Sequence, residues 1–76
     1  MKIQILGTGC PNCVKLTENV ETALREMGAE AEIEKVTDID RIVALGVMVT
    51  PGLAVDGVVK SSGRVLSPRE IQALLA

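Results

Sequence analysis

Hydrophobic residues form two different patterns in the first third of the chain, a short apolar run and then a repeat, and each pattern predicts a different element. The run "KIQIL", residues 2–6, is short and mostly apolar, which indicates a strand, and the Gly7-Thr8-Gly9 turn ends it. Pro11 suits the first turn of a helix, and Gly28 suits a helix end. Between them, apolar residues recur at steps of three and four, which predicts an amphipathic helix (Leu16, Val20, Ala23, Leu24 and Met27).

The pattern then changes to short segments. Residues 29–36, "AEAEIEKV", alternate small or apolar residues with glutamates and predict a half-exposed strand. Thr37 or Asp38 is expected to cap a short helix that ends near Gly46 and carries four apolar residues (Ile39, Ile42, Val43 and Leu45). Residues 53–55 and 58–60 predict a hairpin around a turn at Asp56 and Gly57.

The C-terminal segment "SPREIQALLA" carries the signals of a last helix. Ser67 is expected at the N-cap, Pro68 at the first helical position and Glu70 at the position that completes a capping box. Three apolar residues give the helix one hydrophobic face (Ile71, Leu74 and Leu75).

These elements predict an α/β fold of order β-α-β-α-β-β-α in one domain, residues 1–76. The first two strands flank a helix, so we expect them to be parallel, with a right-handed crossover. The last two strands form an antiparallel hairpin. The expected result is a four-stranded mixed sheet with helices on both faces.

Composition narrows the possible functions. Of the 76 residues, 47% are hydrophobic and 0% are aromatic, so the core must consist of aliphatic side chains, with Met27 and Met48 expected among them. The formal net charge of −2 and the lack of aromatic rings argue against nucleic-acid binding. The chain contains 0 histidines, which excludes a Cys–His nucleophile and a Cys2His2 zinc site within one chain.

The N-terminal apolar run is too short for a signal peptide or a membrane span, so we expect a cytoplasmic protein. Cytosolic thiols are kept reduced, and a cysteine pair there is more often catalytic or metal-binding than a structural disulfide. Both cysteines of this chain lie in "GTGCPNC". A disulfide between them would close a minimal loop and add little stability by chain entropy.

Cys10 and Cys13 are separated only by Pro11 and Asn12, where a predicted strand gives way to a predicted helix. Unpaired N–H groups and the positive end of the helix dipole stabilise a thiolate at such a position, and cysteine pKa values fall there. We therefore expect Cys10 to be the exposed nucleophile and Cys13 the shielded resolving thiol. Gly9, together with the two intervening residues, would shape the active-site loop.

A second signal is "VTPGLAV", in which Pro51 directly precedes an apolar strand. Proline cannot donate a hydrogen bond to a sheet. The residue pattern alone leaves two readings open: a cis X-Pro bond in a specific turn, or a trans proline that opens the strand.

Taken together, these residues resemble the thioredoxin fold, and in particular the small thioredoxin- or glutaredoxin-like redox-active disulfide proteins of archaea and bacteria. The resemblance covers essentially the whole chain: the C-x-x-C motif, Thr50-Pro51, and the segment "LAVDGVVKSSGRVLSPREIQALL". It implies that Pro51 is cis and lies against Cys10 and Cys13, and that the Thr50 backbone pairs with an extended substrate segment.

The chain departs from thioredoxins in three places. Gly9 stands where thioredoxins carry a tryptophan, Pro11-Asn12 replaces Gly-Pro, and "KIQIL" lacks the acidic residue that lies buried under the thioredoxin disulfide. These differences concern the route of proton transfer and the redox potential.

Two other functions remain open from the sequence. Small Cu(I) carriers also place a C-x-x-C after a first strand, but their order is β-α-β-β-α-β and they usually carry Met where this chain has Thr8. A glutathione-linked glutaredoxin could use Lys60 and Arg64 to bind a carboxylate, although both fit ordinary solvated surface. Lys15, one turn beyond the cysteines, could lower a thiol pKa slightly through its positive charge, or it could be an ordinary residue of the helix surface.

The function we expect is that of a thiol-disulfide oxidoreductase that reduces disulfides in partner proteins through a reversible Cys10–Cys13 disulfide. We expect no cofactor and no metal, and no nucleic-acid or membrane partner. The protein is expected to be a monomer that takes electrons from a reductase or dithiol, which the sequence does not name.

Overall fold

The computed structural model describes residues 1–9 and 11–75. Its elements follow the predicted order β-α-β-α-β-β-α. They are β1 (Lys2–Leu6), α1 (Pro11–Met27), β2 (Glu32–Val36), α2 (Ile39–Ala44), β3 (Gly52–Val55), β4 (Val58–Ser62) and α3 (Pro68–Leu75).

The strands form a four-stranded mixed sheet of order β2-β1-β3-β4, as predicted. β1 pairs in parallel with β2, in a register that sets Ile5 beside Lys35. On its other side β1 pairs antiparallel with β3, which in turn pairs antiparallel with β4. The central position of β1 means that the chain leaves the middle of the sheet at Leu6, where the candidate site begins.

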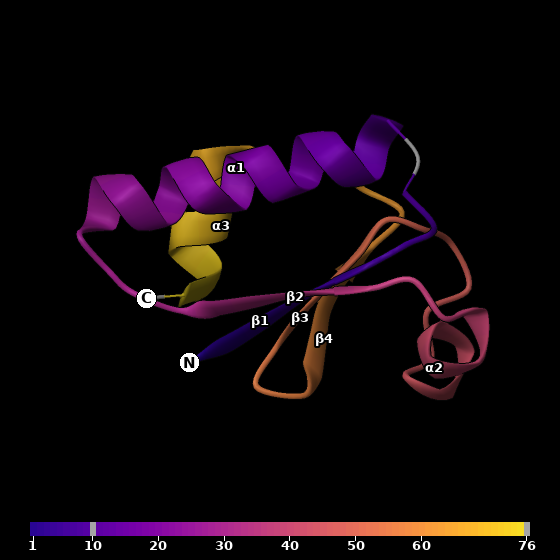
Figure 1. Ribbon diagram of the computed structural model, residues 1–76. Coiled ribbons are helices and arrows are strands. Elements are labelled where there is room, and N and C mark those ends of the chain that lie inside the picture. Colours follow the sequence, from indigo (N-terminus) through magenta and orange to yellow (C-terminus); the bar gives the residue numbers. More distant parts are fainter. Residues whose placement is uncertain (10, 76) are drawn as a thin grey trace.

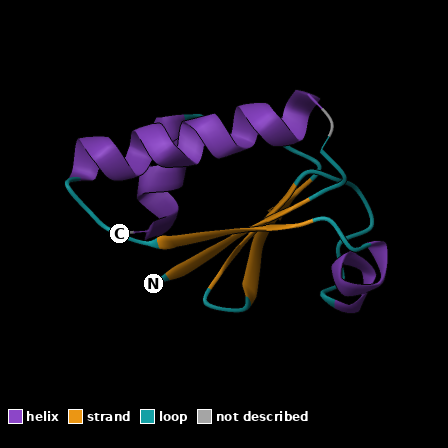
Figure 2. Ribbon diagram, viewed as in Figure 1, coloured by secondary structure: helices purple, strands orange, loops and turns teal. Residues whose placement is uncertain are grey.

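Helices cover both faces of this sheet. Figures 1 and 2 show α1 lying along one face with α3 beside it, while α2 lies at the far end of the strands. The larger core joins α1 and α3 to that face of the sheet, through residues such as Ile3, Leu16, Val20, Leu53 and Ile71. A smaller core on the opposite face includes Ile42 of α2 (with Leu6, Val36, Val47 and Ala54).

Glycines end both of the first two helices in the same way. The Gly28 N–H donates to the Arg25 carbonyl, and the Ala29 N–H donates to the Leu24 carbonyl. This double hydrogen bond is a Schellman motif, and it requires the positive φ of 65° at Gly28. Because Ala29 is used in the helix cap, β2 begins at Glu32 rather than at residue 29 as predicted.

The hairpin and the last helix follow the predicted signals closely. Asp56 and Gly57 both have positive φ, which two-residue hairpin turns favour. β4 extends to Ser62 rather than residue 60 because β3 continues to pair with it beyond a bulge.

α3 has the predicted capping box: Ser67 Oγ accepts from the Glu70 N–H, and Glu70 Oε1 accepts from the Ser67 N–H.

One expectation from the sequence is wrong, and the structure decides between two candidates for another. Met27 and Met48 are not core residues, since they are 40% and 82% exposed. Met27 is the last residue of α1, and Met48 lies in the loop between α2 and β3, where no layer covers it. For α2, the cap is Asp38 rather than Thr37, because the Asp38 carboxylate accepts from the Asp40 N–H. None of the described helices is both long and apolar enough to cross a membrane.

Candidate active site

The candidate site lies where β1 ends and α1 begins. The Gly7 N–H donates to the Val36 carbonyl at 2.9 Å, so the parallel pairing with β2 holds the chain one residue past the end of β1. α1 then begins with Pro11 and Asn12, both exposed. Cys10, the expected nucleophile, lies outside the described residues. The described part of the site therefore consists of Cys13 and the residues around it.

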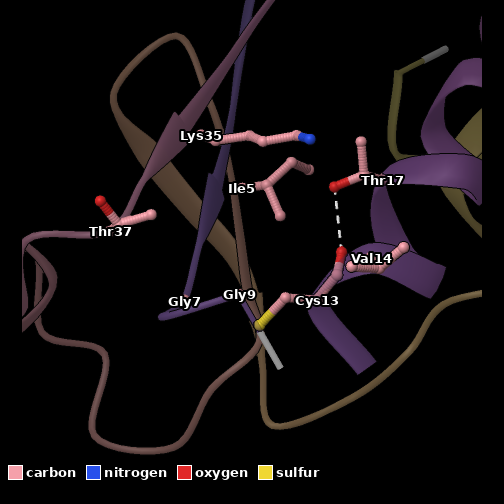
Figure 3. Close-up of a pocket in the computed structure, with 8 residues that line it drawn as sticks. All are labelled: Ile5, Gly7, Gly9, Cys13, Val14, Thr17, Lys35 and Thr37. Carbon is pink, nitrogen blue, oxygen red and sulfur yellow. Dashed lines mark hydrogen bonds between the residues drawn. The ribbon is translucent and has the colours of Figure 1, made fainter. Parts of the chain in front are cut away.

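Cys13 lies on the inner side of α1, in its first turn. It is 5% exposed, and its side chain points from the helix toward the turn at Gly7 and Gly9 (Figure 3). One turn further along, the Thr17 hydroxyl donates to the Cys13 carbonyl at 2.9 Å. This bond holds the polar Thr17 side chain against its own helix, so Thr17 can be buried.

A small cavity of about 60 Å³ lies next to Cys13. A water molecule needs about 10–15 Å³ of such space, so the cavity is large enough to hold water. Its wall comes from β1, β2, α1 and the adjoining turns, as Figure 3 shows (Ile5, Gly7, Gly9, Cys13, Val14, Thr17, Lys35 and Thr37). Gly9, predicted to shape the loop, lies here with a positive φ of 87°.

Lys35 is the one charged residue among these lining residues of the described chain. It lies beside Ile5 in the parallel register, and its side chain extends past Ile5 toward α1 (Figure 3). Lys15, the basic residue considered from the sequence, is an exposed residue of α1 and does not line this cavity. The alternation of "EIEKV" placed Ile33 and Lys35 on one face of β2, yet only the register with β1 shows which face that is.

The turn before β3 reaches the same region. The peptide bond between Thr50 and Pro51 is cis, as the resemblance implies. A Cβ atom built on Gly7 would lie 3.7 Å from the Thr50 Cβ and would collide with the Cys13 sulfur. Cys13 and Thr50 are thus brought together on one side of Gly7, although they are far apart in sequence.

The loop that contains Gly63 lies against Pro51 and Val49. The Gly63 N–H donates to the Pro51 carbonyl at 2.9 Å, and a Cβ on Gly63 would lie 3.0 Å from Val49 Cγ1. Val49 and Met48 are nevertheless 61% and 82% exposed. Two apolar side chains therefore face solvent directly before Thr50, although Met48 was expected in the core.

The residues considered for glutathione lie elsewhere. Lys60 and Arg64 border a separate cavity of about 280 Å³ between β4 and α3. Arg64 donates to Glu70 at 2.9 Å, and the pKa of Glu70 is lowered, first by the hydrogen bond from the Ser67 N–H. The two basic residues are thus not brought to the Cys13 cavity.

Comparisons with known proteins agree with this arrangement. The thioredoxin domain family model matches residues 1–76. A thioredoxin of Methanothermobacter thermautotrophicus is 50% identical over 76 residues, which are 100% of this chain and 99% of that protein. A thioredoxin of Methanocaldococcus jannaschii is 50% identical over 70 residues, which are 92% of this chain and 80% of that protein. The chain therefore belongs to the thioredoxin family of thiol-disulfide oxidoreductases.

Proposed function

We propose that the protein reduces disulfides in partner proteins through Cys10 and Cys13. The Cys10 thiolate attacks one sulfur of the substrate disulfide, forms a mixed disulfide and releases the other substrate sulfur as a thiolate. The Cys13 thiolate then attacks the Cys10 sulfur and releases the second substrate thiolate. Two electrons have moved to the substrate, and the protein holds a Cys10–Cys13 disulfide, which a reductase or small dithiol reduces again.

The observation that carries this proposal is the position of Cys13. Its sulfur is shielded inside the first turn of α1, close to Gly7, while Pro11 and Asn12 are exposed. A shielded second thiol suits resolution, because it reacts with a disulfide delivered to it within the protein and not with outside disulfides.

The substrate is proposed to lie along the turn at Thr50 and Pro51. The Thr50 backbone would pair with an extended substrate segment, as in strand addition. Met48 and Val49 are exposed just before it, and they offer apolar contact to substrate side chains next to the disulfide. We further propose that the protein acts as a monomer in the cytoplasm.

A Cu(I) carrier gains no support from the fold. That reading needs a strand where the chain has α2, Ile39–Ala44, and the observed order is β-α-β-α-β-β-α. The separation of Lys60 and Arg64 from the Cys13 cavity likewise gives no support to a glutathione site.

The decisive experiment compares two single variants with a disulfide-bonded protein substrate. We expect Cys10→Ser to abolish exchange, because the remaining thiol, Cys13, is shielded from the substrate disulfide. We expect Cys13→Ser to accumulate a covalent complex with the substrate through Cys10. The complex is detected by mass spectrometry after acid quenching, and dithiothreitol should reduce it. If Cys10→Ser accumulated the complex and Cys13→Ser did not, the two roles would be reversed.

A further inference from the structure

The glycines of this protein are needed for different reasons. Gly9, Gly28, Gly46, Gly57 and Gly63 have positive φ, a conformation that other residues rarely adopt. Gly7 does not have a positive φ. Its backbone conformation is therefore available to any residue, and the reason for glycine at this position must be the space around it.

Among the described residues, only one neighbouring atom is too close for a side chain at Gly7. A Cβ there would lie 3.5 Å from the Cys13 Cβ and 3.7 Å from the Thr50 Cβ, and both distances are ordinary contacts. The Cys13 sulfur, in contrast, would collide with it. The missing side chain of Gly7 thus makes room for the sulfur of Cys13.

The two backbones have little freedom to separate. The Gly7 N–H is tied to the Val36 carbonyl, and Gly7 itself is buried. Cys13 lies in the first turn of α1, where the Thr17 hydroxyl binds its carbonyl. A methyl group at Gly7 would therefore be accommodated chiefly by rotation of the Cys13 side chain, which moves the sulfur away from Gly7.

We propose that Gly7 is a positioning residue for Cys13: its missing side chain fixes where the resolving sulfur lies. This inference rests on the proposed role of Cys13. When the Cys13 thiolate attacks the mixed disulfide, a new S–S bond forms to Cys10 and the bond from Cys10 to the substrate breaks. The new bond has narrow geometric limits, so a displaced sulfur resolves the mixed disulfide more slowly.

A double-mutant cycle of unfolding stability tests whether the side chain missing at Gly7 makes room for the Cys13 sulfur. This stability cycle does not rely on any redox role. The variants Gly7→Ala, Cys13→Ala and the double variant are unfolded by denaturant under reducing conditions and followed by circular dichroism. We expect Gly7→Ala to lower the unfolding midpoint in the wild-type background, and much less in the Cys13→Ala background, because the colliding sulfur is gone. An equal loss in both backgrounds, or a double variant that fails to fold, overturns the proposal.

A kinetic experiment tests the functional part. Gly7→Ala keeps both cysteines, and we expect its mixed disulfide with a protein substrate to persist about ten- to a hundredfold longer than that of the wild type. Val20→Ala is the control, because it removes buried core volume from α1 about two turns away from Cys13, in a core cluster that does not include Cys13. A mixed disulfide that persists equally in both variants would mean that lost stability, not sulfur position, causes the delay.

The outcomes separate this inference from the proposed function. If Cys13→Ser traps the mixed disulfide but Gly7→Ala resolves it at the wild-type rate, the role of Cys13 stands and the positioning role of Gly7 is wrong. If Cys13→Ser traps nothing, the resolving role itself is wrong, and the stability cycle then decides only whether Gly7 accommodates the sulfur.

Discussion

At the scale of single residues, the charged residue that lines the cavity beside Cys13, among the described residues, belongs to β2 rather than to α1. Lys35 and Cys13 line the same cavity, and a nearby cation favours the thiolate that attacks the mixed disulfide in the proposed reaction. We expect Lys35→Met to slow resolution by about 1.5- to 5-fold, since exposed charge pairs contribute about 0.2–1 kcal/mol. Quenching the reaction at successive times and measuring the mixed disulfide by mass gives this rate.

Lys15→Met is the matched control for this prediction. It removes the same charge from an exposed position of α1 that does not line the cavity. We expect its resolution rate to match that of the wild type, and we expect added salt to reduce the difference between the wild type and Lys35→Met. Equal slowing in the two variants would show that overall charge matters and the position of Lys35 does not.

At the scale of elements, the capping box of α3 supports a helix of only 8 residues. Helices this short depend on their caps and on packing, and Ile71 is the residue of α3 that is fully buried. We expect Ser67→Ala to cost about 1 kcal/mol of unfolding free energy and to lower the melting temperature by about 4–8 °C. Ser62→Ala, at an exposed position at the end of β4, should leave thermal unfolding unchanged; a similar loss there would rule out the cap as the cause.

The same element signals explain how much of the fold the sequence predicts. The repeat in α1, the glycine after it and the capping box of α3 are local signals, and each matches the structure. In α2 the signal is weaker: four apolar residues were expected on its face, but only Ile42 is buried, while Ile39 and Val43 are exposed. A two-turn helix at the end of a sheet covers little surface, and periodicity does not show how much surface there is to cover.

The candidate site is only partly predictable, because much of it depends on contacts between distant segments. The C-x-x-C motif and Thr50-Pro51 are visible in the sequence, but their proximity is not. Gly7 resembles a turn residue in the sequence, and only the position of the Cys13 sulfur shows why it lacks a side chain. Lys35 enters the site through the register of β1 with β2, which no local pattern fixes.

At the scale of the whole molecule, two carboxylates link separate segments of the fold: Glu34 connects β2 to β1 and α2, and Glu70 connects α3 to the segment that follows β4. Glu34 of β2 accepts hydrogen bonds from Gln4 of β1 at 2.8 Å and from Arg41 of α2 at 3.3 Å. Glu70 of α3 accepts from Arg64, which follows β4, and from the Ser67 N–H. The pKa of Glu34 is lowered, chiefly by the Gln4 hydrogen bond, and the pKa of Glu70 is lowered, chiefly by the Ser67 N–H.

These lowered pKa values predict how stability depends on pH. In the unfolded chain both groups return to their ordinary pKa of 4.5, so the unfolded chain binds protons first as pH falls. The stabilisation is fully present above that value, and it is lost as pH falls through the folded-state pKa values.

Denaturant midpoints measured from about pH 7 down to about pH 3 should therefore decline below about pH 4.5. The double variant of Glu34→Gln and Glu70→Gln should show a smaller decline, whereas Glu21→Gln, at an exposed position on α1, should keep it. An undiminished decline in the double variant would assign the acid sensitivity to other carboxylates.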